Sequence, residues 1–366
     1  MPMRSIFIIA TCALLSTGAW AQVVFNSVSV RTHDGQIHNF AINRVDSITF
    51  DTVRSVQTDK WYHMLENPGI ADYLRDFEYD PMDYSYHRLF DYRGEPYLDK
   101  RQDWPYGVTL GDTTYYNLIP GKTYTLQRCE DGVLTPVTIH TLGQLRMIKA
   151  EGIDNVRDLG GWPTLSGKHI RYGMLFRGVE MNTAYSTIPE QARSTHAITE
   201  EDRRMLREDL GIRAELDLRA NSENPAKGYS ALGRDIVYAN YNIRYGEISS
   251  VENQALLLSC LRFVAEQVEA GRPTYIHCIW GADRTGLLCM MLEGLLGVSQ
   301  SNLDKDYELT SFSGNTRYRN DTNYRSVIQK IVAMEGRTLQ EKFRNCWKEF
   351  GATDAELDRF IEMMTE

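Results

Sequence analysis

The sequence predicts a multidomain protein in which an all-β, sandwich-like region is followed by an α/β domain. From Gln22 to about Leu145, short β-rich runs alternate with turn residues and show no helical period. After about Met147, helical patterns alternate with short apolar strands, which is typical of an α/β domain. The length of 366 residues agrees with two or three domains. A composition of 42% hydrophobic and 24% charged residues is that of a globular chain rather than a disordered one.

The charge balance limits the partners that this protein can bind. The chain has 40 Lys and Arg residues against 49 Asp and Glu residues, which gives a formal net charge of −9. A broad electrostatic attraction to nucleic acid or to anionic lipid is therefore not expected. Any phosphate group must be held by local contacts.

Residues 1–21 have the three parts of a signal peptide in order. Arg4 gives a basic start, an apolar run extends over 6–15, and residues 19–21 form an Ala-x-Ala cleavage site. The apolar run is too short to span a bilayer. We expect cleavage before Gln22 and export to the periplasm or the cell exterior. The alternatives are a buried N-terminal strand and a lipoprotein attached through Cys12.

The β region is expected to consist of two parts. Residues 22–57 predict a β-hairpin segment, with a turn at 34–35, and residues 58–146 predict a second β domain. The motif Leu-x-Pro-Gly-x-x-Tyr at 118–124 resembles the late strands of fibronectin type III and immunoglobulin-like sandwiches, where the Tyr hydroxyl ties the corner to the backbone. An unrelated small β domain is the alternative. We expect an accessory module that positions the protein or binds a protein or glycan.

Residues 147–366 predict the α/β domain. Thr199 caps a helix that ends at Gly211, and Ser249 with Glu252 forms a capping box for a helix up to Gly271. Thr353 with Glu356 forms a further capping box. The predicted strands are 212–218, 236–239 and 273–277, and the other predicted helices are 284–296, 323–335, 338–350 and 354–365.

The residues that carry chemistry lie between the last predicted strand and the helix after it. Residues 277–286 read His-Cys-Ile-Trp-Gly-Ala-Asp-Arg-Thr-Gly. A short loop between a strand and a helix can turn its N–H groups toward an anion, and the helix N-terminus stabilises a thiolate at Cys278. Arg284 can bind two phosphate oxygens with its planar guanidinium. The arrangement predicts attack of sulfur on phosphorus, a cysteinyl-phosphate intermediate and its hydrolysis by water, with no metal or cofactor required.

The same segment resembles the Cys-x5-Arg signature of protein tyrosine phosphatases. Residues 155–161, 175–178 and 211–219 resemble the Asn-x-Arg-Asp-Leu-Gly-Gly, Phe-Arg and Asp-Leu-Arg blocks of the bacterial tyrosine/lipid phosphatase branch of that superfamily. The resemblance covers about 150–310. It implies that Cys278 is the nucleophile, that Thr285 hydrogen-bonds the sulfur and that His277 orients the loop. The residues implied to bind phosphate are Ile279, Trp280, Gly281, Ala282, Asp283 and Arg284.

The general acid is less clearly marked in the sequence. Many tyrosine phosphatases carry it on a Trp-Pro-Asp loop, and this chain has no such tripeptide. In the branch that it resembles, an Asp directly before the signature Arg serves as the acid, which implies Asp283. The alternatives are Asp217 and Asp158, for which we favour a supporting role in a salt bridge with Arg219 or Arg157.

The leading hypothesis for function is a secreted protein tyrosine phosphatase that acts on phosphotyrosine or a related phosphomonoester. Rival hypotheses are an inositol-phosphate (phytase-like) or phosphoinositide phosphatase and a phosphate-binding pseudoenzyme with an interaction role. The branch often carries Lys where this chain has Ala282, which argues against a highly anionic lipid. Trp280 is expected either to stack on a phenyl ring or to fill space. A polyphosphate substrate needs further cations, and the candidates are Arg177, Arg213 and Arg219.

The remaining cysteines have no assigned role in this prediction. Their pairing is left open, as is oxidation of Cys278 against a neighbour such as Cys289. These residues are Cys129, Cys260, Cys289 and Cys346.

Overall fold

The computed structural model describes residues 8–13, 24–31, 37–41, 54–57, 88–90, 96–99, 108–142, 145–182, 196–223, 228–313, 317, 319 and 321–366. The chain divides into two compact units, Met1–Val53 and Arg54–Glu366. Among the described residues, no helix has the length and apolar character needed to cross a membrane.

The first unit contains a three-stranded antiparallel sheet. Its strands are β1 (Ile8–Ala13), β2 (Val24–Arg31) and β3 (Ile37–Ala41), in the order β1-β2-β3. Strands β2 and β3 form the hairpin predicted around 34–35. Strand β1 lies inside the segment predicted to be a signal peptide, and cleavage of that segment stays a prediction.

The β part of the second unit is built around a long hairpin. Strand β10 (Val133–Leu142) pairs antiparallel with β9 (Thr123–Glu130) and parallel with β4 (Arg54–Gln57). Two further hairpins join β5 (Arg88–Phe90) to β6 (Pro96–Asp99) and β7 (Val108–Leu110) to β8 (Thr113–Tyr115).

The corner predicted from the motif at 118–124 has the expected tie to the backbone. The hydroxyl oxygen of Tyr124 accepts a hydrogen bond of 2.9 Å from the N–H of Ile119. Most of residues 58–107 lies outside the described residues. The complete fibronectin- or immunoglobulin-like sandwich therefore stays a prediction.

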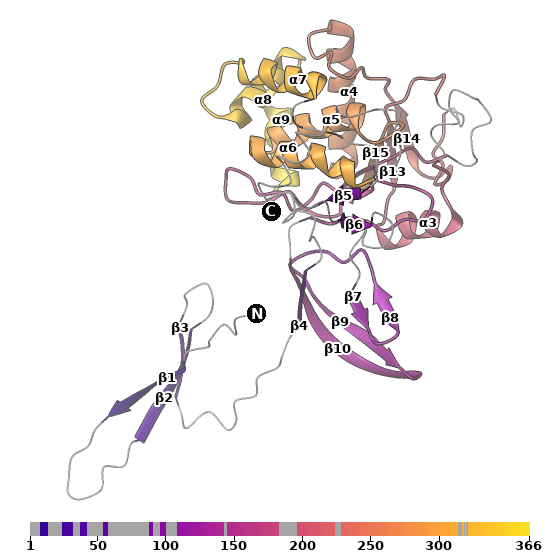
Figure 1. The fold of residues 1–366 in the computed structure, drawn as a ribbon. Coiled ribbons are helices and arrows are strands. Elements are labelled where there is room, and N and C mark those ends of the chain that lie inside the picture. The colour runs from indigo at the N-terminus through magenta and orange to yellow at the C-terminus, as the bar shows by residue number, and fades with distance from the viewer. Residues whose placement is uncertain are drawn as a thin grey trace, which may run out of the picture. The chain divides into compact units, whose positions relative to one another are not determined.

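The α/β part carries a five-stranded sheet with the order β11-β12-β15-β13-β14. Figure 1 labels three of these strands, β13, β14 and β15, next to helices α4 (Val251–Glu269) and α5 (Asp283–Leu295). Four strands are parallel, and β11 runs antiparallel to β12. The strands are β11 (Arg157–Asp158), β12 (Leu175–Gly178), β13 (Ala214–Asp217), β14 (Val237–Asn240) and β15 (Thr274–His277). The predicted strands at 212–218, 236–239 and 273–277 correspond to β13, β14 and β15.

The helices agree with the predicted pattern except at three places. After Thr199 the helix changes into a π-helical turn, the N-cap of α4 is Ser250 rather than Ser249, and α6 was not predicted. Because the third residue of α4 is Asn253, the predicted box with Glu252 is wrong by one position. The helices are α3 (Glu200–Arg204), η2 (Met205–Asp209), α4 (Val251–Glu269), α5 (Asp283–Leu295), α6 (Gln300–Leu309), η3 (Thr310–Ser313), α7 (Thr322–Val332), α8 (Leu339–Glu349) and α9 (Asp354–Met364).

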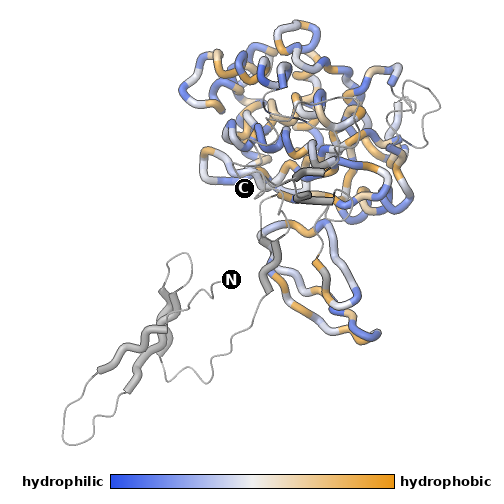
Figure 2. Tube along the Cα trace, viewed as in Figure 1, coloured by the Kyte–Doolittle hydropathy of each residue, from blue (hydrophilic) through white to orange (hydrophobic). Residues whose placement is uncertain are grey.

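Both faces of the sheet are buried, because alternate residues of each strand point to opposite sides. On β12, Leu175 joins the large core formed with helices α4 to α9, whereas Phe176 joins a smaller core that includes Met205 and Leu206 of η2. On β15, Ile276 belongs to the large core and Tyr275 belongs to the smaller one. Figure 2 shows the resulting concentration of hydrophobic residues inside this part of the chain.

The carboxyl ends of three strands meet beside the predicted catalytic loop. In the sheet register, His277 at the end of β15 lies opposite Gly178 of β12 and Asp217 of β13. Residues 278–282 then connect β15 to α5. The carboxyl edge of a parallel sheet is the usual position of a ligand site in such folds.

Candidate active site

Cys278 lies at the start of a loop whose carbonyl groups accept hydrogen bonds from residues outside the loop. The residue is 3% exposed. The N–H of Glu180 donates to the carbonyl of Ile279 at 3.0 Å, and Asn155 Nδ2 donates to the carbonyls of Trp280 and Gly281 at 3.2 Å each. These contacts fix the outward direction of three successive carbonyl groups.

The N–H groups of the same loop are available for an anion. Within the described residues, none of the N–H groups of residues 279–282 donates a hydrogen bond. In a tight loop whose carbonyls point outward, the N–H groups converge on the other side. The helix α5 begins at Asp283, so its positive N-terminal end adds to the same centre. The loop is therefore built to hold an anion next to Cys278.

Gly281 permits the loop to lie directly against the end of β12. Its φ angle is +60°, a conformation that side chains disfavour. A Cβ atom on Gly281 would lie 2.1 Å from the carbonyl oxygen of Gly178. A Cβ on Gly178 would in turn lie 2.1 Å from the hydroxyl oxygen of Tyr275. Both glycines of the predicted blocks are thus required by close packing.

Arg284 is held by a residue that the sequence did not single out. Its Nη1 and Nη2 atoms donate to the two carboxylate oxygens of Glu223 at 2.6 and 3.3 Å. Burial lowers the pKa of Arg284, but the hydrogen bond to Glu223 and the nearby negative charges, those of Glu223 and Asp217 among them, together outweigh burial and raise the pKa. Glu223 occupies the Nη1–Nη2 edge of the guanidinium. Within the described residues Nε donates no hydrogen bond and Nη2 donates only to Glu223, which leaves the second N–H of Nη2 directed along the Nε–Nη2 edge. That edge is available for two oxygens of a phosphate group.

Thr285 carries an unsatisfied hydroxyl group in the same region. The residue is fully buried, and its Oγ1 has no hydrogen-bond partner within the described part of the chain. Buried hydroxyl groups normally have a hydrogen-bond partner, so this hydroxyl is available to bond a further group in the site. Hydrogen bonding to the Cys278 sulfur stays a prediction that fits this observation.

His277 connects the loop to strand β13 through its two ring nitrogens. Its Nε2 lies 3.0 Å from Glu215 Oε1, and its Nδ1 lies 3.0 Å from the carbonyl oxygen of Cys278. Burial lowers the pKa of His277, but the carboxylates of Asp217 and Glu215 outweigh burial and raise it. A protonated ring donates both N–H groups, one to Glu215 and one to the Cys278 carbonyl.

Glu215, Asp217 and His277 also form a compact set of potential metal ligands. The donor atoms of this set already have protein partners. Glu215 accepts hydrogen bonds from His277 and from Ser230, and Asp217 accepts from Arg219. Because these hydrogen bonds occupy the donor atoms, the three residues do not fit a metal. They stabilise the structure next to the catalytic loop instead.

Asp283, the acid implied by the resemblance, is bound to Arg317. The Nε and Nη2 atoms of Arg317 each lie 2.7 Å from one carboxylate oxygen of Asp283. Burial lowers the pKa of Arg317, but the hydrogen bond to Asp283 and the negative charges of Asp283 and Asp321 together outweigh burial and raise the pKa. Both carboxylate oxygens of Asp283 are thus engaged by Arg317, and the carboxyl group must separate from it to reach a leaving group.

The alternative acids occupy supporting positions. Asp217 accepts hydrogen bonds from Arg219 and from the hydroxyl of Tyr238, at 2.8 and 2.9 Å. Burial raises the pKa of Asp217, but His277 and Arg219 outweigh burial and lower it. The pairing of Asp217 with Arg219 agrees with the structural interpretation that we favoured.

Asp158 has a different partner from the one expected. It accepts hydrogen bonds from the N–H groups of Gly160 and Gly173, both at 2.8 Å, and lies 3.3 Å from Arg146. The expected pair with Arg157 is not the one observed, because the Arg157 guanidinium binds Asp306. Burial raises the pKa of Asp158.

None of the three candidate cations adds charge to the mouth of the site. Arg177 is fully buried and bound to Asp306 and to the Gly281 carbonyl. Arg219 is 1% exposed and bound to Asp217 and Glu180. Arg213 precedes β13, at the amino end of the strand, whereas the catalytic loop lies at the carboxyl edge of the sheet.

Trp280 is half-buried in the loop and has an aromatic neighbour. The ring of His196 meets it edge-on, with ring centroids 5.2 Å apart. This contact holds one side of the indole in place. The structure thus gives Trp280 a packing partner, and stacking on a substrate ring stays a prediction.

The cysteines of this unit are free thiols. These are Cys129, Cys260, Cys278, Cys289 and Cys346. Burial raises the pKa of Cys289 to about 12, so this thiol stays protonated and unreactive near neutral pH. The burial of Cys289 therefore argues against its oxidation with Cys278.

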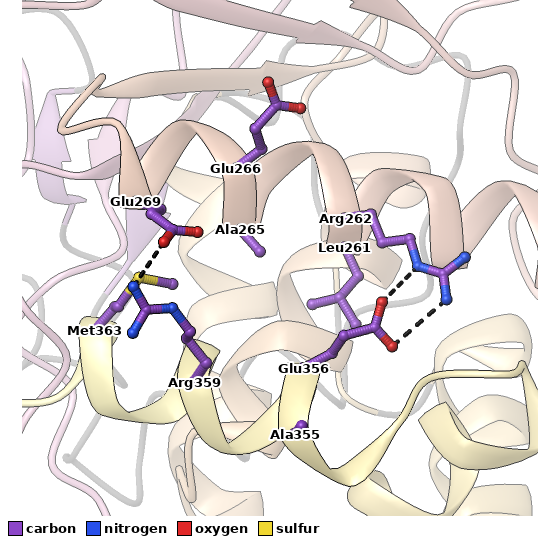
Figure 3. Close-up of a pocket in the computed structure, with 9 residues that line it drawn as sticks. All are labelled: Leu261, Arg262, Ala265, Glu266, Glu269, Ala355, Glu356, Arg359 and Met363. Atoms are coloured by element: carbon purple, nitrogen blue, oxygen red, sulfur yellow. Dashed lines mark hydrogen bonds and ion pairs between the residues drawn. The ribbon is translucent and has the colours of Figure 1, made fainter.

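A separate crevice of about 400 Å³ lies between α4 and α9 (Figure 3). Two ion pairs bridge the helices across it, Arg262 with Glu356 and Arg359 with Glu269. None of the residues that line it belongs to the predicted catalytic set. This crevice plays no part in the candidate active site.

Several solved structures are similar to about half of this chain. No curated protein matches the chain. Among solved structures, TpbA of P. aeruginosa is 13% identical, with 50% of this chain and 91% of that chain covered and a TM-score of 0.31. The core catalytic domain of the PP-IP phosphatase SIW14 from S. cerevisiae, in complex with citrate, is 18% identical over 50% of this chain and 94% of that chain, with a TM-score of 0.28. PTPMT1 in complex with PI(5)P is 10% identical over 49% and 92%, with a TM-score of 0.27.

A family match covers the whole α/β part. Residues 148–363, more than half of the chain, match the tyrosine phosphatase family. The matched range contains the loop of Cys278, the Asn155 block and the strands that position both. The chain belongs to the tyrosine phosphatase family.

Proposed function

We propose that this protein is an exported, cysteine-dependent phosphatase that hydrolyses phosphotyrosine or a related phosphomonoester. The observation that carries the proposal is the loop of residues 279–282 beside Cys278, whose carbonyls are bound outward and whose N–H groups donate to no group in the part of the chain that the structure describes. Export rests on the signal sequence at 1–21. The β region is proposed as an accessory module that positions the enzyme or binds a protein or glycan.

The proposed reaction has two steps. The Cys278 thiolate attacks phosphorus, the S–P bond forms and the ester P–O bond breaks, while the leaving oxygen takes a proton from Asp283. Water then attacks phosphorus and gives a proton to the Asp283 carboxylate, the S–P bond breaks, the Cys278 thiolate is restored and inorganic phosphate leaves. The loop N–H groups and the free edge of Arg284 stabilise the equatorial oxygens in both steps, and Thr285 stabilises the departing sulfur.

The charges around the site favour a monoester over a polyphosphate. Arg177 and Arg219 are buried and paired, and Arg213 lies at the other end of its strand. Ala282 contributes no charge to the loop. Trp280, held edge-on by His196, offers an aromatic surface that suits a phenyl ring.

Phosphate release from matched substrates tests this proposal. The substrates are a phosphotyrosine peptide, phytate and a phosphoinositide, each with wild type and Cys278→Ser. We expect release from the phosphotyrosine peptide at the highest kcat/KM, and none by Cys278→Ser. Preference for phytate or the phosphoinositide would support the rival substrate class. Absence of release from every substrate would support the pseudoenzyme, and release that is independent of Cys278 would contradict the mechanism.

A further inference from the structure

We propose that Asp306, on α6, is a positioning residue that holds the anion-binding loop in its active shape. Its carboxylate fixes two buried arginines, and these arginines fix the outward carbonyls of the loop. The proposal rests on the function proposed above, because it assigns a role in forming that same site.

The first connection runs through Arg177. The Nη1 atom of Arg177 binds Asp306 Oδ2, and Nη2 donates to the carbonyl of Gly281 at 2.8 Å and to that of Ala282 at 3.5 Å. One guanidinium therefore links the carboxylate directly to two carbonyls of the loop. Because Arg is planar, fixing one edge also fixes the direction of the other.

The second connection runs through Arg157 and Asn155. Arg157 Nε donates to Asp306 Oδ1 at 2.9 Å, and Nη2 donates to the Asp306 carbonyl at 2.7 Å. Arg157 Nη1 donates to Asn155 Oδ1, whose Nδ2 then binds the carbonyls of Trp280 and Gly281. The amide of Asn155 is thereby oriented with its donor toward the loop.

Burial makes this arrangement dependent on Asp306. Asp306 is 3% exposed, Arg157 is 2% exposed and Arg177 is fully buried. Two buried cations without a carboxylate carry a large desolvation cost and repel each other. Loss of the Asp306 charge would therefore displace one or both guanidiniums, and the loop carbonyls would lose their donors.

The test compares Asp306→Asn with Asp304→Asn in the full chain. Asp304 lies two residues earlier on the same helix and accepts a hydrogen bond of 2.9 Å from the Tyr324 hydroxyl. It also lies 3.8 Å from Arg319, and among the described residues it makes no hydrogen bond or ion pair with the loop. The readouts are the dissociation constant of inorganic phosphate, kcat and KM for an aryl phosphate, and the melting temperature. We expect Asp306→Asn to weaken phosphate binding at least tenfold and to raise KM, whereas Asp304→Asn stays within twofold of wild type.

A second variant keeps the test decisive if Asp306→Asn does not fold. Asn155→Asp retains the acceptor for Arg157 and removes the Nδ2 donor to the loop, so it should also weaken phosphate binding at least tenfold. If Asp306→Asn and Asn155→Asp act through one connection, the fold-loss of phosphate affinity in the double variant will be smaller than the product of the fold-losses in the two single variants. A fold-loss in the double variant that equals this product would contradict the connection.

The outcomes separate this inference from the proposed function. A folded Asp306→Asn variant, or Asn155→Asp in its place, that binds phosphate like wild type would overturn the positioning role and leave the phosphatase assignment intact. Wild type that binds no phosphate and releases none from any substrate would overturn the proposed function, and the positioning role with it.

Discussion

Replacing Gly281 by alanine should inactivate the enzyme more strongly than it unfolds the protein. The residue has φ +60°, and its added Cβ would lie 2.1 Å from the Gly178 carbonyl oxygen and 2.4 Å from its carbon. Real Cβ atoms essentially never approach closer than 3.0 Å, so the loop and β12 must separate by about 0.9 Å. The left-handed conformation costs alanine roughly 1–2 kcal/mol. Overpacking costs a further 1–3 kcal/mol or so.

The expected loss of activity follows from the size of that displacement. A misplacement of about 1 Å at a reacting centre costs on the order of 10²-fold in rate. We therefore expect Gly281→Ala to lower kcat/KM for p-nitrophenyl phosphate about 100-fold. The melting temperature should fall by several degrees, because a destabilisation of 1 kcal/mol shifts it by roughly 2–4 °C in a domain of this size.

A matched glycine separates close packing from backbone strain. Gly167 has φ +80°, and a Cβ there would meet nothing within 4 Å. Gly167→Ala should lose stability through strain alone and keep wild-type kcat/KM. Activity of Gly281→Ala within threefold of wild type would refute the reasoning, as would equal inactivation by Gly167→Ala.

Three further variants test separate parts of the site and its support. Asp283→Asn should lower kcat/KM more for phenyl phosphate than for p-nitrophenyl phosphate, since a poor leaving group needs the proton more; equal losses in a steady-state assay would exclude Asp283 as the acid. His277 has a raised pKa, so its protonation stabilises the fold fully below about pH 6.5, and this contribution is lost as the pH rises through the folded pKa. The stability difference between wild type and His277→Gln, measured by denaturant unfolding, should therefore shrink above that pH, and a constant difference would count against a charged His277. Asn117→Gly removes the acceptor of a 2.7 Å bond from the Lys149 N–H, and should cost about 1 kcal/mol by thermal unfolding while kcat stays unchanged; a fall in kcat would show that the β part takes part in catalysis.

The strands and the catalytic loop were predictable because their signals are local. The apolar run at 273–277, the motif after it and the glycine that ends α5 lie close together in the sequence. The supporting ion pairs have no such local signal. Arg284 meets Glu223 across 61 residues, and Arg177 meets Asp306 across 129 residues. Sequence reasoning therefore placed Arg177 wrongly among the candidates for substrate binding.

Helix α6 was missed for a physical reason. Beside the apolar residues that join the core, the helix buries four polar ones, which are Asn302, Asp304, Asp306 and Glu308. These polar residues interrupt the apolar stripe by which a helix is recognised in a sequence. The burial of Asp306 is explained only by its partners Arg157 and Arg177, which lie far away in the sequence. Helix α6 thus combines hydrophobic packing with a charge that supports the catalytic loop.

The central claim is that Cys278 forms a covalent bond to phosphorus. Rapid acid quenching during turnover of an aryl phosphate, followed by mass spectrometry of the protein, measures this directly. We predict one phosphate per protein, attached to Cys278, and no phosphorylated protein with Cys278→Ser. Phosphate attached to another residue, or turnover that persists in Cys278→Ser, would contradict the account.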